Sequence, residues 1–248
     1  MHHDDEQVGR VLSRREVLAL LGAGGVSMLG GGTPLAGLAG PGLRLPACIV
    51  RPRQTEGPYF LDDMLERADI RTDPTDGSVC EGMPLDLAFR VSRLDGDGCR
   101  PLPGAVVDIW QCDAVGVYSG VEDIIGGLFD TRGKSFLRGY QITDTEGVAR
   151  FRTIFPGWYQ GRTVHIHFKI RTAPDSAAGH EFTSQVYFDD AVADRVLELE
   201  PYASHDGEGR MRNAQDQIYR SGGDQLLLAV EETGDGYAAA LDIGLQIG

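Results

Sequence analysis

Residues 84–92 read PLDLAFRVS, and this stretch is the clearest indication of the fold. Its apolar side chains, Leu85, Leu87, Phe89 and Val91, stand at every second position with polar or small residues between them. Successive side chains of a β-strand point to opposite faces, so a period of two is typical of a strand buried on one side. The stretch therefore predicts a strand that packs one face against a core.

The same alternation recurs along the chain between short turns rich in Asp and Gly. Short strands at such regular spacing are typical of β-sandwiches. The sequence therefore predicts an all-β fold, an antiparallel β-sandwich. Further strands are expected over residues 105–110, 137–143, 148–154, 163–171, 185–188, 225–231 and 237–243, with turns at 95–98, 113–116 and 144–147.

Two short helices and one irregular segment complete the expected fold. A helix is predicted over residues 190–198, where apolar side chains recur at helical spacing, and a second one over 212–219. Residues 41–83 show little periodicity, and we expect them to form an extended N-terminal wrap over the sandwich.

Composition and charge exclude several classes of function. The 248 residues include 23 Lys and Arg against 37 Asp and Glu, a formal net charge of −14. A protein that binds nucleic acid or an anionic membrane surface needs clustered positive charge, which this balance argues against. The hydrophobic content of 42% and charged content of 24% are those of an ordinary globular domain and not of a disordered chain.

Residues 1–40 have the pattern of a bacterial export signal. Arg14 and Arg15 form a twin arginine, an apolar stretch follows over 17–29, and small residues come after it. This order is typical of secretion by the twin-arginine route. The apolar stretch is too short for a membrane span of about 20 residues. We expect an export signal over 1–40, one β-sandwich domain over 41–248 and a periplasmic or extracellular protein; a frayed N-terminal helix is the alternative.

The four cysteines are Cys48, Cys80, Cys99 and Cys112, and their spacing matches no paired zinc knuckle. In an oxidising compartment an even number indicates up to two disulfides, and four cysteines allow three pairings. The alternative is four buried thiols.

Residues 155–168 read FPGWYQGRTVHIHF and carry the strongest indication of chemistry. Residues two apart in a strand share a face, so His165 and His167 project together. Two imidazoles on one face can chelate iron, copper or zinc. Taken alone, however, such a pair is more often a hydrogen-bonded or surface pair than a metal site.

Five motifs, in the right order, resemble those of the intradiol ring-cleavage dioxygenases, and they span residues 48–220. One is PGWY at 156–159, with Arg162 three residues before His165. The others are TEGPY at 55–59, VDIWQCDAVGVYS at 107–119, a central hairpin with Gly139, TD at 143–144, Gly147 and FRTI at 151–154, and QVYF at 185–188.

The resemblance implies a non-haem ferric ion, Fe(III), bound by Tyr118, Tyr159, His165 and His167. A phenol has a pKa of about 10, and it ionises at neutral pH when a Lewis-acidic cation takes the place of the proton. Two phenolate ligands favour ferric over ferrous iron. The implied reaction adds both atoms of O2 to a catecholic ring, which is cleaved between its two hydroxylated carbons to a muconate-type diacid.

The resemblance also implies three catalytic side chains. Arg162 would stabilise negative charge that develops on the ring, Tyr159 would be the ligand displaced by substrate, and Gln185 would hydrogen-bond near the substrate. A surface arginine and a half-buried strand glutamine are the alternatives. Asp113 is expected to shape the loop that presents Tyr118. Catechol, hydroxyquinol, protocatechuate and lignin-derived catechols all stay open as substrates, and a homodimer stays open as the assembly.

Two readings from other classes compete with the oxygenase. A non-catalytic secreted β-sandwich of the transthyretin-like or adhesin-like kind, which binds carbohydrate or protein, would have the same strand pattern. It would not need two tyrosines and two histidines to converge. A secreted zinc or copper hydrolase would use His165 and His167, but no carboxylate stands at a suitable spacing.

Overall fold

A computed structural model describes residues 49–95, 98–122, 129–173, 179–205 and 209–247, all within one unit, Pro46–Gly248. The expected export signal over 1–40 lies outside these residues, as do Cys48 and the two central residues of the turn at 95–98. No helix among the described residues is long and apolar enough to cross a membrane.

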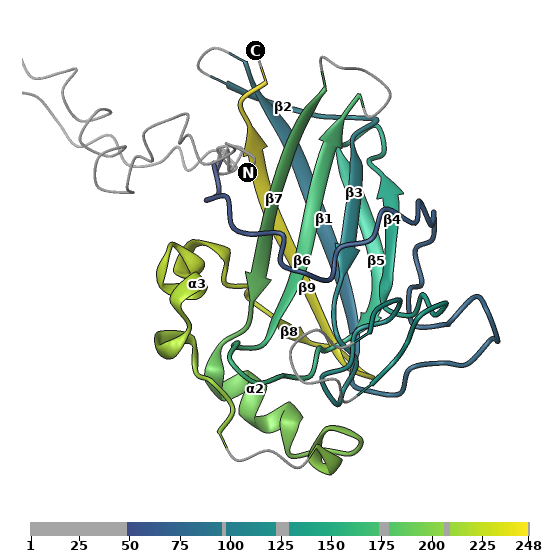
Figure 1. The fold of residues 1–248 in the computed structure, drawn as a ribbon. Coiled ribbons are helices and arrows are strands. Elements are labelled where there is room, and N and C mark those ends of the chain that lie inside the picture. Colours follow the sequence, from purple (N-terminus) through teal and green to yellow (C-terminus); the bar gives the residue numbers. More distant parts are fainter. Residues whose placement is uncertain (1–48, 96–97, 123–128, 174–178, 206–208, 248) are drawn as a thin grey trace, which may run out of the picture. The chain divides into compact units, whose positions relative to one another are not determined.

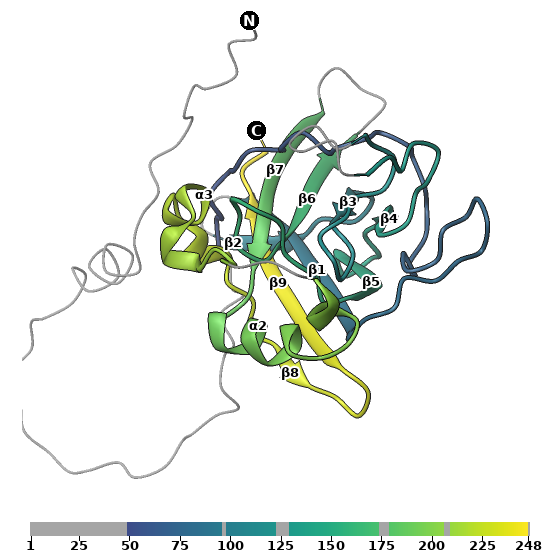
Figure 2. The same cartoon turned by 60° about the horizontal axis from the view of Figure 1, so that its bottom comes forward.

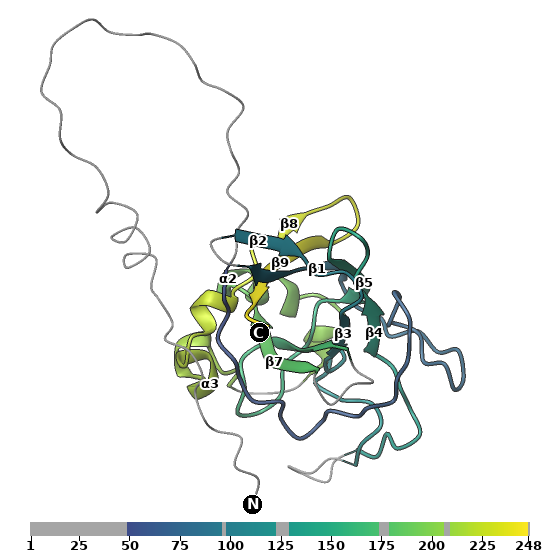
Figure 3. The same ribbon diagram turned by 90° about the horizontal axis from the view of Figure 1, so that it is seen from above.

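The described strands form two sheets that lie in two layers (Figure 3). This arrangement confirms the all-β sandwich. One sheet has the order β2 (Gly98–Pro101), β1 (Pro84–Asp95), β9 (Tyr237–Leu245) and β8 (Glu231–Glu232), with β5 (Val148–Ile154) also paired to β1. The other has the order β4 (Arg138–Ile142), β3 (Val106–Trp110), β6 (His165–Thr172) and β7 (His180–Tyr187).

One pair of strands departs from the antiparallel arrangement that the sequence predicted. β1 and β9 run parallel, in register from Leu85 opposite Tyr237 to Arg93 opposite Leu245, whereas the other strand pairs of both sheets are antiparallel. The chain between β7 and β9 returns to the end of the sheet at which β1 begins. β9 therefore enters beside β1 in the same direction, and the first sheet is mixed.

The helices lie near β7 (Figures 1 and 2). α2 (Asp190–Leu197) confirms the helix predicted over 190–198, and the Asp189 side chain accepts a hydrogen bond from Ala191 N at its start. The helix predicted over 212–219 is divided into η2 (Asn213–Gln215) and α3 (Gln217–Arg220). Asp216 stands between them. A further turn, η1, covers Tyr202–Ser204.

The strand predicted over 225–231 is wrong. Gly222 has a left-handed conformation, φ 95°, and starts a short helical turn, η3 (Gly223–Leu226). Beyond it, Leu227 forms a single bridge with Tyr187, and β8 begins only at Glu231. The alternation of buried Leu226 and Leu228 reflects packing against the core without a strand ladder.

The main core lies between the two sheets, and only the inner face of β6 contributes to it. Phe89 of β1 packs on Phe168 of β6, with ring centroids 5.1 Å apart, and Ile166 and Ile170 share that inner face. His165 and His167 alternate with these residues. They therefore lie on the outer face of the four-stranded sheet.

Residues 49–67 cover that outer face as the first part of the expected N-terminal wrap (Figure 1), whereas Ile70 N donates to Arg152 O of β5, so the following residues lie against the other sheet. Gln54 N donates to Thr183 O of β7 at 3.1 Å, and Arg67 N donates to Tyr140 O of β4 at 3.1 Å. The segment therefore crosses the sheet from one edge strand to the other, over β6 and β3. The segment shields this face from water, so polar side chains on it can form a buried site.

The cysteines form fewer than the two disulfides that the sequence allowed. Cys99 is disulfide-bonded, whereas Cys80 and Cys112 are free thiols, so at most one of the two bridges forms. Burial raises the pKa of Cys80 to about 12 and raises that of Cys112 as well. Both thiols are therefore protonated at neutral pH.

Candidate metal centre

The four predicted ligands come from three segments that meet on the outer face of β6. His165 and His167 are residues of β6 itself and are 2% and 1% exposed. Tyr118 lies in the loop after β3, and Tyr159 lies in the loop between β5 and β6. Tyr118 is 1% exposed, and Tyr159 is half-buried.

The two tyrosine loops are held against each other by backbone contacts. Asp113 begins the first loop, and its side chain accepts hydrogen bonds from Val115 N at 3.0 Å and Val117 N at 2.9 Å, which confirms its expected role in shaping this loop. Gly157 N of the second loop donates to Asp113 O at 3.0 Å. A side chain at Gly157 would collide with that backbone. The close approach therefore depends on glycine.

The four side chains converge. His165 Nε2 lies 3.0 Å from His167 Nε2, and the Tyr159 hydroxyl lies 3.3 Å from His165 Nε2. The ring centroid of Tyr118 lies 5.7 Å from that of Tyr159 and 6.3 Å from that of His167. Two phenol oxygens and two imidazole nitrogens thus face a common volume.

The orientation of His165 is set by the backbone two residues earlier. Its Nδ1 donates to Thr163 O at 2.6 Å, which directs the unprotonated Nε2 towards His167 and Tyr159. Burial lowers the pKa of His165 well below its ordinary value, and the neighbouring Arg162 lowers it further. Burial, followed by the effect of His165, does the same to the pKa of His167. Both imidazoles are therefore neutral, as metal ligands must be.

The two phenols are protonated in the absence of a cation. Burial raises the pKa of Tyr118 well above 10, and it raises that of Tyr159 as well. Tyr118 Oη is buried and has no hydrogen-bond partner among the described residues. Buried hydroxyls are nearly always paired, so an unpaired one on a ring beside Tyr159 and His167 indicates a missing partner.

This donor set fits a trivalent, Lewis-acidic iron ion. Imidazole nitrogen and phenolate oxygen suit iron, and two phenolates would balance two of its three charges. No group of three or more His, Cys, Asp or Glu side chains suited to a metal occurs in the described ranges. A hydrolase centre built on His165 and His167 with carboxylates is therefore not supported by these residues.

Aromatic rings pack around the ligands and hold them in place. Trp110 stacks on His167 with centroids 5.0 Å apart and an interplanar angle of 9°. Tyr59 of the N-terminal wrap stacks on Tyr118 at 4.4 Å and 20°. Such packing restricts the rotation of both ligand rings.

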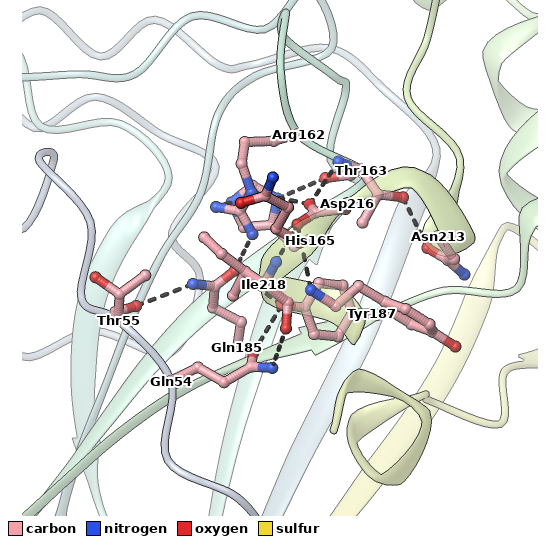
Figure 4. Close-up of polar contacts among 12 residues, drawn as sticks. Gln54, Thr55, Arg162, Thr163, His165, Gln185, Tyr187, Asn213, Asp216 and Ile218 are labelled. Carbon is pink, nitrogen blue, oxygen red and sulfur yellow. Dashed lines mark hydrogen bonds and ion pairs between the residues drawn. The ribbon is translucent and has the colours of Figure 1, made fainter. Parts of the chain in front are cut away.

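Arg162 and Gln185 join the same site (Figure 4). Arg162 Nη2 donates to Gln185 Oε1 at 2.5 Å, and Nη1 lies 3.4 Å from His165 Nε2. Gln185 stands opposite His167 in the β6–β7 ladder, and its Nε2 donates to Thr55 O at 2.9 Å. Arg162 is 13% exposed, so the alternative of a surface arginine is wrong.

Sequence reasoning missed three residues that shape the site. Asp216 accepts from Arg162 Nε at 2.9 Å, and Asn213 Oδ1 accepts from Thr163 Oγ1 at 2.7 Å (Figure 4). Gly57 lies against the ring of His167. Gly57 belongs to the TEGPY motif, so the sequence contained a signal that could have identified it as a site residue. Asp216 and Asn213 carry no local signal, because only the tertiary fold brings them to residues about 50 positions away.

Comparisons with known proteins agree with this geometry. A family model described as Dioxygenase matches residues 55–205. Chlorocatechol 1,2-dioxygenase from Pseudomonas putida is 30% identical over 154 residues, which cover 54% of this chain and 52% of that protein. The chain thus spans about half the length of the curated relatives it matches.

Two solved structures extend the likeness to the fold. An intradiol ring-cleavage dioxygenase from Tetranychus urticae is similar with a TM-score of 0.69 and 29% identity, over 80% of this chain and 95% of that one. The dioxygenase domain of a dioxygenase carbohydrate-binding protein fusion from Streptomyces sp. SirexAA-E gives a TM-score of 0.56 and 30% identity, over 81% and 100%. This chain belongs to the intradiol ring-cleavage dioxygenase family.

Proposed function

We propose that the chain is a non-haem ferric dioxygenase that cleaves catecholic rings between the two hydroxylated carbons. The observation that carries this proposal is the convergence of Tyr118, Tyr159, His165 and His167, with His165 Nε2 and His167 Nε2 3.0 Å apart. These four residues would hold the iron. When bound, ferric iron supplies a Lewis-acidic centre that accepts both catechol oxygens and activates the ring towards O2.

The two tyrosines have different surroundings, and we assign them different roles. Tyr118 is buried, and its ring is stacked on Tyr59. Tyr159 is half-buried at the edge of the site, next to exposed Gln160. Tyr159 Oη is therefore the phenolic oxygen better able to take a proton from an entering catechol hydroxyl, while Tyr118 keeps its position.

Arg162 and Gln185 would act on the substrate. The guanidinium of Arg162 is fixed beside His165, where it can stabilise negative charge that develops on the ring. Burial alone would lower the pKa of Arg162, but Tyr159 and Asp216 beside it keep that pKa above its ordinary value. The group therefore stays cationic, and its hydrogen bond to Gln185 keeps both side chains directed at the site.

A test combines colour, product and two variants. Iron-loaded protein should show a broad visible band from phenolate-to-iron charge transfer that shifts when catechol is added, and ¹⁸O2 should label both new oxygens of the diacid product. Tyr159→Phe and His165→Ala should each lower ring cleavage by about 100-fold or more, the second through loss of iron. Tyr140→Phe, a tyrosine of β4, is the matched control and should keep its rate.

Other outcomes would favour a binding module. An unchanged rate of ring cleavage in either ligand variant contradicts the ligand assignment. A preparation that stays colourless and inactive after iron loading contradicts the oxygenase. The sandwich would then be a module that binds carbohydrate or protein.

We also propose that the chain is exported by the twin-arginine route. The support is the pair Arg14 and Arg15 followed by an apolar stretch. Replacing both arginines by lysine should retain the protein in the cytoplasm, and fractionation of cells would measure this. An unchanged distribution would contradict the proposal.

A further inference from the structure

Asp216 is a buried carboxylate that the proposed chemistry does not use directly. It lies between η2 and α3, and its side chain is 1% exposed. Oδ2 accepts from Arg162 Nε at 2.9 Å and from Thr163 N at 3.0 Å. Oδ1 accepts from Ile218 N at 2.7 Å and Tyr219 N at 3.2 Å. One oxygen therefore serves the candidate metal centre and the other caps α3.

The contact with Arg162 determines where the guanidinium points. Because the guanidinium is planar, a hydrogen bond from Nε to Asp216 fixes the directions of Nη1 and Nη2. Nη2 then donates to Gln185 Oε1, and Nη1 lies 3.4 Å from His165 Nε2, a long contact (Figure 4). Among the described residues, Asp216 is the hydrogen-bond acceptor that holds Nε, so without it the guanidinium is free to rotate and to donate fully to the lone pair of His165.

The contact with Thr163 reaches His165 by a second route. Thr163 N is held by Asp216 and Thr163 Oγ1 by Asn213, so this residue is anchored to the η2–α3 segment at two atoms. Thr163 O in turn accepts from His165 Nδ1 at 2.6 Å. Partners of this kind orient metal-bound histidines and set their tautomer.

We propose that Asp216 is a positioning residue that orients both Arg162 and His165 for the reaction. This inference rests on the proposed function. Asp216 couples the segment 213–220 to the site, because the same carboxylate starts α3 and anchors residues 162 and 163.

Asp216→Asn separates the two roles of the side chain. The amide oxygen can still cap α3, but the amide NH2 group then faces the donors Arg162 Nε and Thr163 N. We expect kcat for catechol to fall about 10–100-fold with a smaller change in KM, and iron to pass to a chelator about tenfold faster, since changes to such partners have effects of this size. The chelator assay needs no turnover.

Asp108→Asn is the matched control. Asp108 pairs with Arg171 at 2.7 Å, both side chains are largely buried at 11% and 14% exposure, and Arg171 lies on the same strand as the histidines. The control should lose stability without the change in iron release. In an Arg162→Gln background, Asp216→Asn should lower kcat by less than it does in the native background, because one of its two targets is gone.

The possible failures can be told apart. A wild-type protein that cleaves no catechol overturns the proposed function and this inference with it. Cleavage by the wild type, with kcat and iron release of Asp216→Asn equal to those of Asp108→Asn, overturns this inference alone. If the asparagine variant does not fold, Asp216→Glu keeps the charge and displaces the carboxylate by one methylene; native kcat and iron release in that variant would overturn the inference.

Discussion

Gly57 lies directly against the imidazole of His167: a Cβ at position 57 would be 3.1 Å from His167 Cε1. The residue also has φ +73°, a conformation that side chains rarely adopt. The N-terminal wrap therefore touches a proposed metal ligand through a residue that must be glycine. This contact explains how a segment without regular structure contributes to the site.

The first prediction tests this contact. Gly57→Ala should reduce iron affinity and activity by about 10–100-fold, because the added methyl group displaces His167. Gly77→Ala is the control, since Gly77 has φ +76° and open space around its Cβ position. Both variants carry the same backbone strain. Equal iron binding in both, measured by titration of the visible band, would show that the contact is unimportant.

A second prediction concerns the two tyrosine loops. A Cβ at Gly116 would lie well inside the contact distance of Trp158 O, so Gly116→Ala should force apart the loops that carry Tyr118 and Tyr159. We expect the overpacking to lower the free energy of unfolding by about 1–3 kcal/mol, in addition to the effect of the backbone strain. Gly133 has φ +82° and nothing within 4 Å of its Cβ position, so Gly133→Ala measures the backbone strain alone. Urea unfolding of the two variants should give clearly different midpoints.

Arg138 provides a third prediction. It is 4% exposed, and it donates to Ser119 Oγ at 2.8 Å, to Tyr59 O at 3.1 Å and to Ser119 O. Burial lowers the pKa of Arg138 to about 10, so the group is charged at neutral pH. Arg138→Lys cannot reproduce this fork, and stranded buried acceptors should lower the free energy of unfolding by about 1–3 kcal/mol. Arg150→Lys, at an exposed site, should have no measurable effect on the free energy of unfolding. Similar unfolding midpoints for Arg138→Lys and Arg150→Lys would contradict the stabilising role of Arg138.

A fourth prediction concerns proton release. Because burial raises the pKa of both tyrosines, loading metal-free protein with Fe(III) or redox-inert Ga(III) at neutral pH should release about two protons per ion. The histidines are already neutral and should add none. A pH-stat measures this release, and Tyr159→Phe should reduce it to about one proton. Loading without any release would exclude phenolate ligands.

A fifth prediction concerns stability and pH in the metal-free protein. Burial lowers the pKa of His165 and His167 well below 6.5, so below pH 6.5 the unfolded chain binds protons that the folded chain excludes. Stability is therefore full above 6.5 and falls as the pH decreases, by up to about 1.4 kcal/mol per pH unit for each histidine. His165→Gln should reduce this slope. Equal slopes in wild type and His165→Gln would refute the assignment.

Local patterns were sufficient for most of the strands, whereas the composition of the site was predicted from the resemblance of the motifs to a known family. Alternation and short apolar runs between turns predicted β1, β3, β5 and β6. Alternation failed at 225–231, where Gly222 starts a helical turn. Alternation does not indicate whether neighbouring strands run parallel or antiparallel. It could not predict that β9 runs parallel to β1, since direction depends on the path of the intervening chain.

The sequence by itself determined which side chains could form the site. Residue spacing of two on one strand brings His165 and His167 to one face, and the loop motifs contain Tyr118 and Tyr159. Only the tertiary structure decided which residues orient them: Gly57, Asp216 and Asn213 come from segments remote in sequence, and their role arises from packing distance. Hydrogen bonds and steric contacts act over a few ångströms of space, and no sequence pattern of period two or 3.6 records a neighbour that is 50 or 100 residues away.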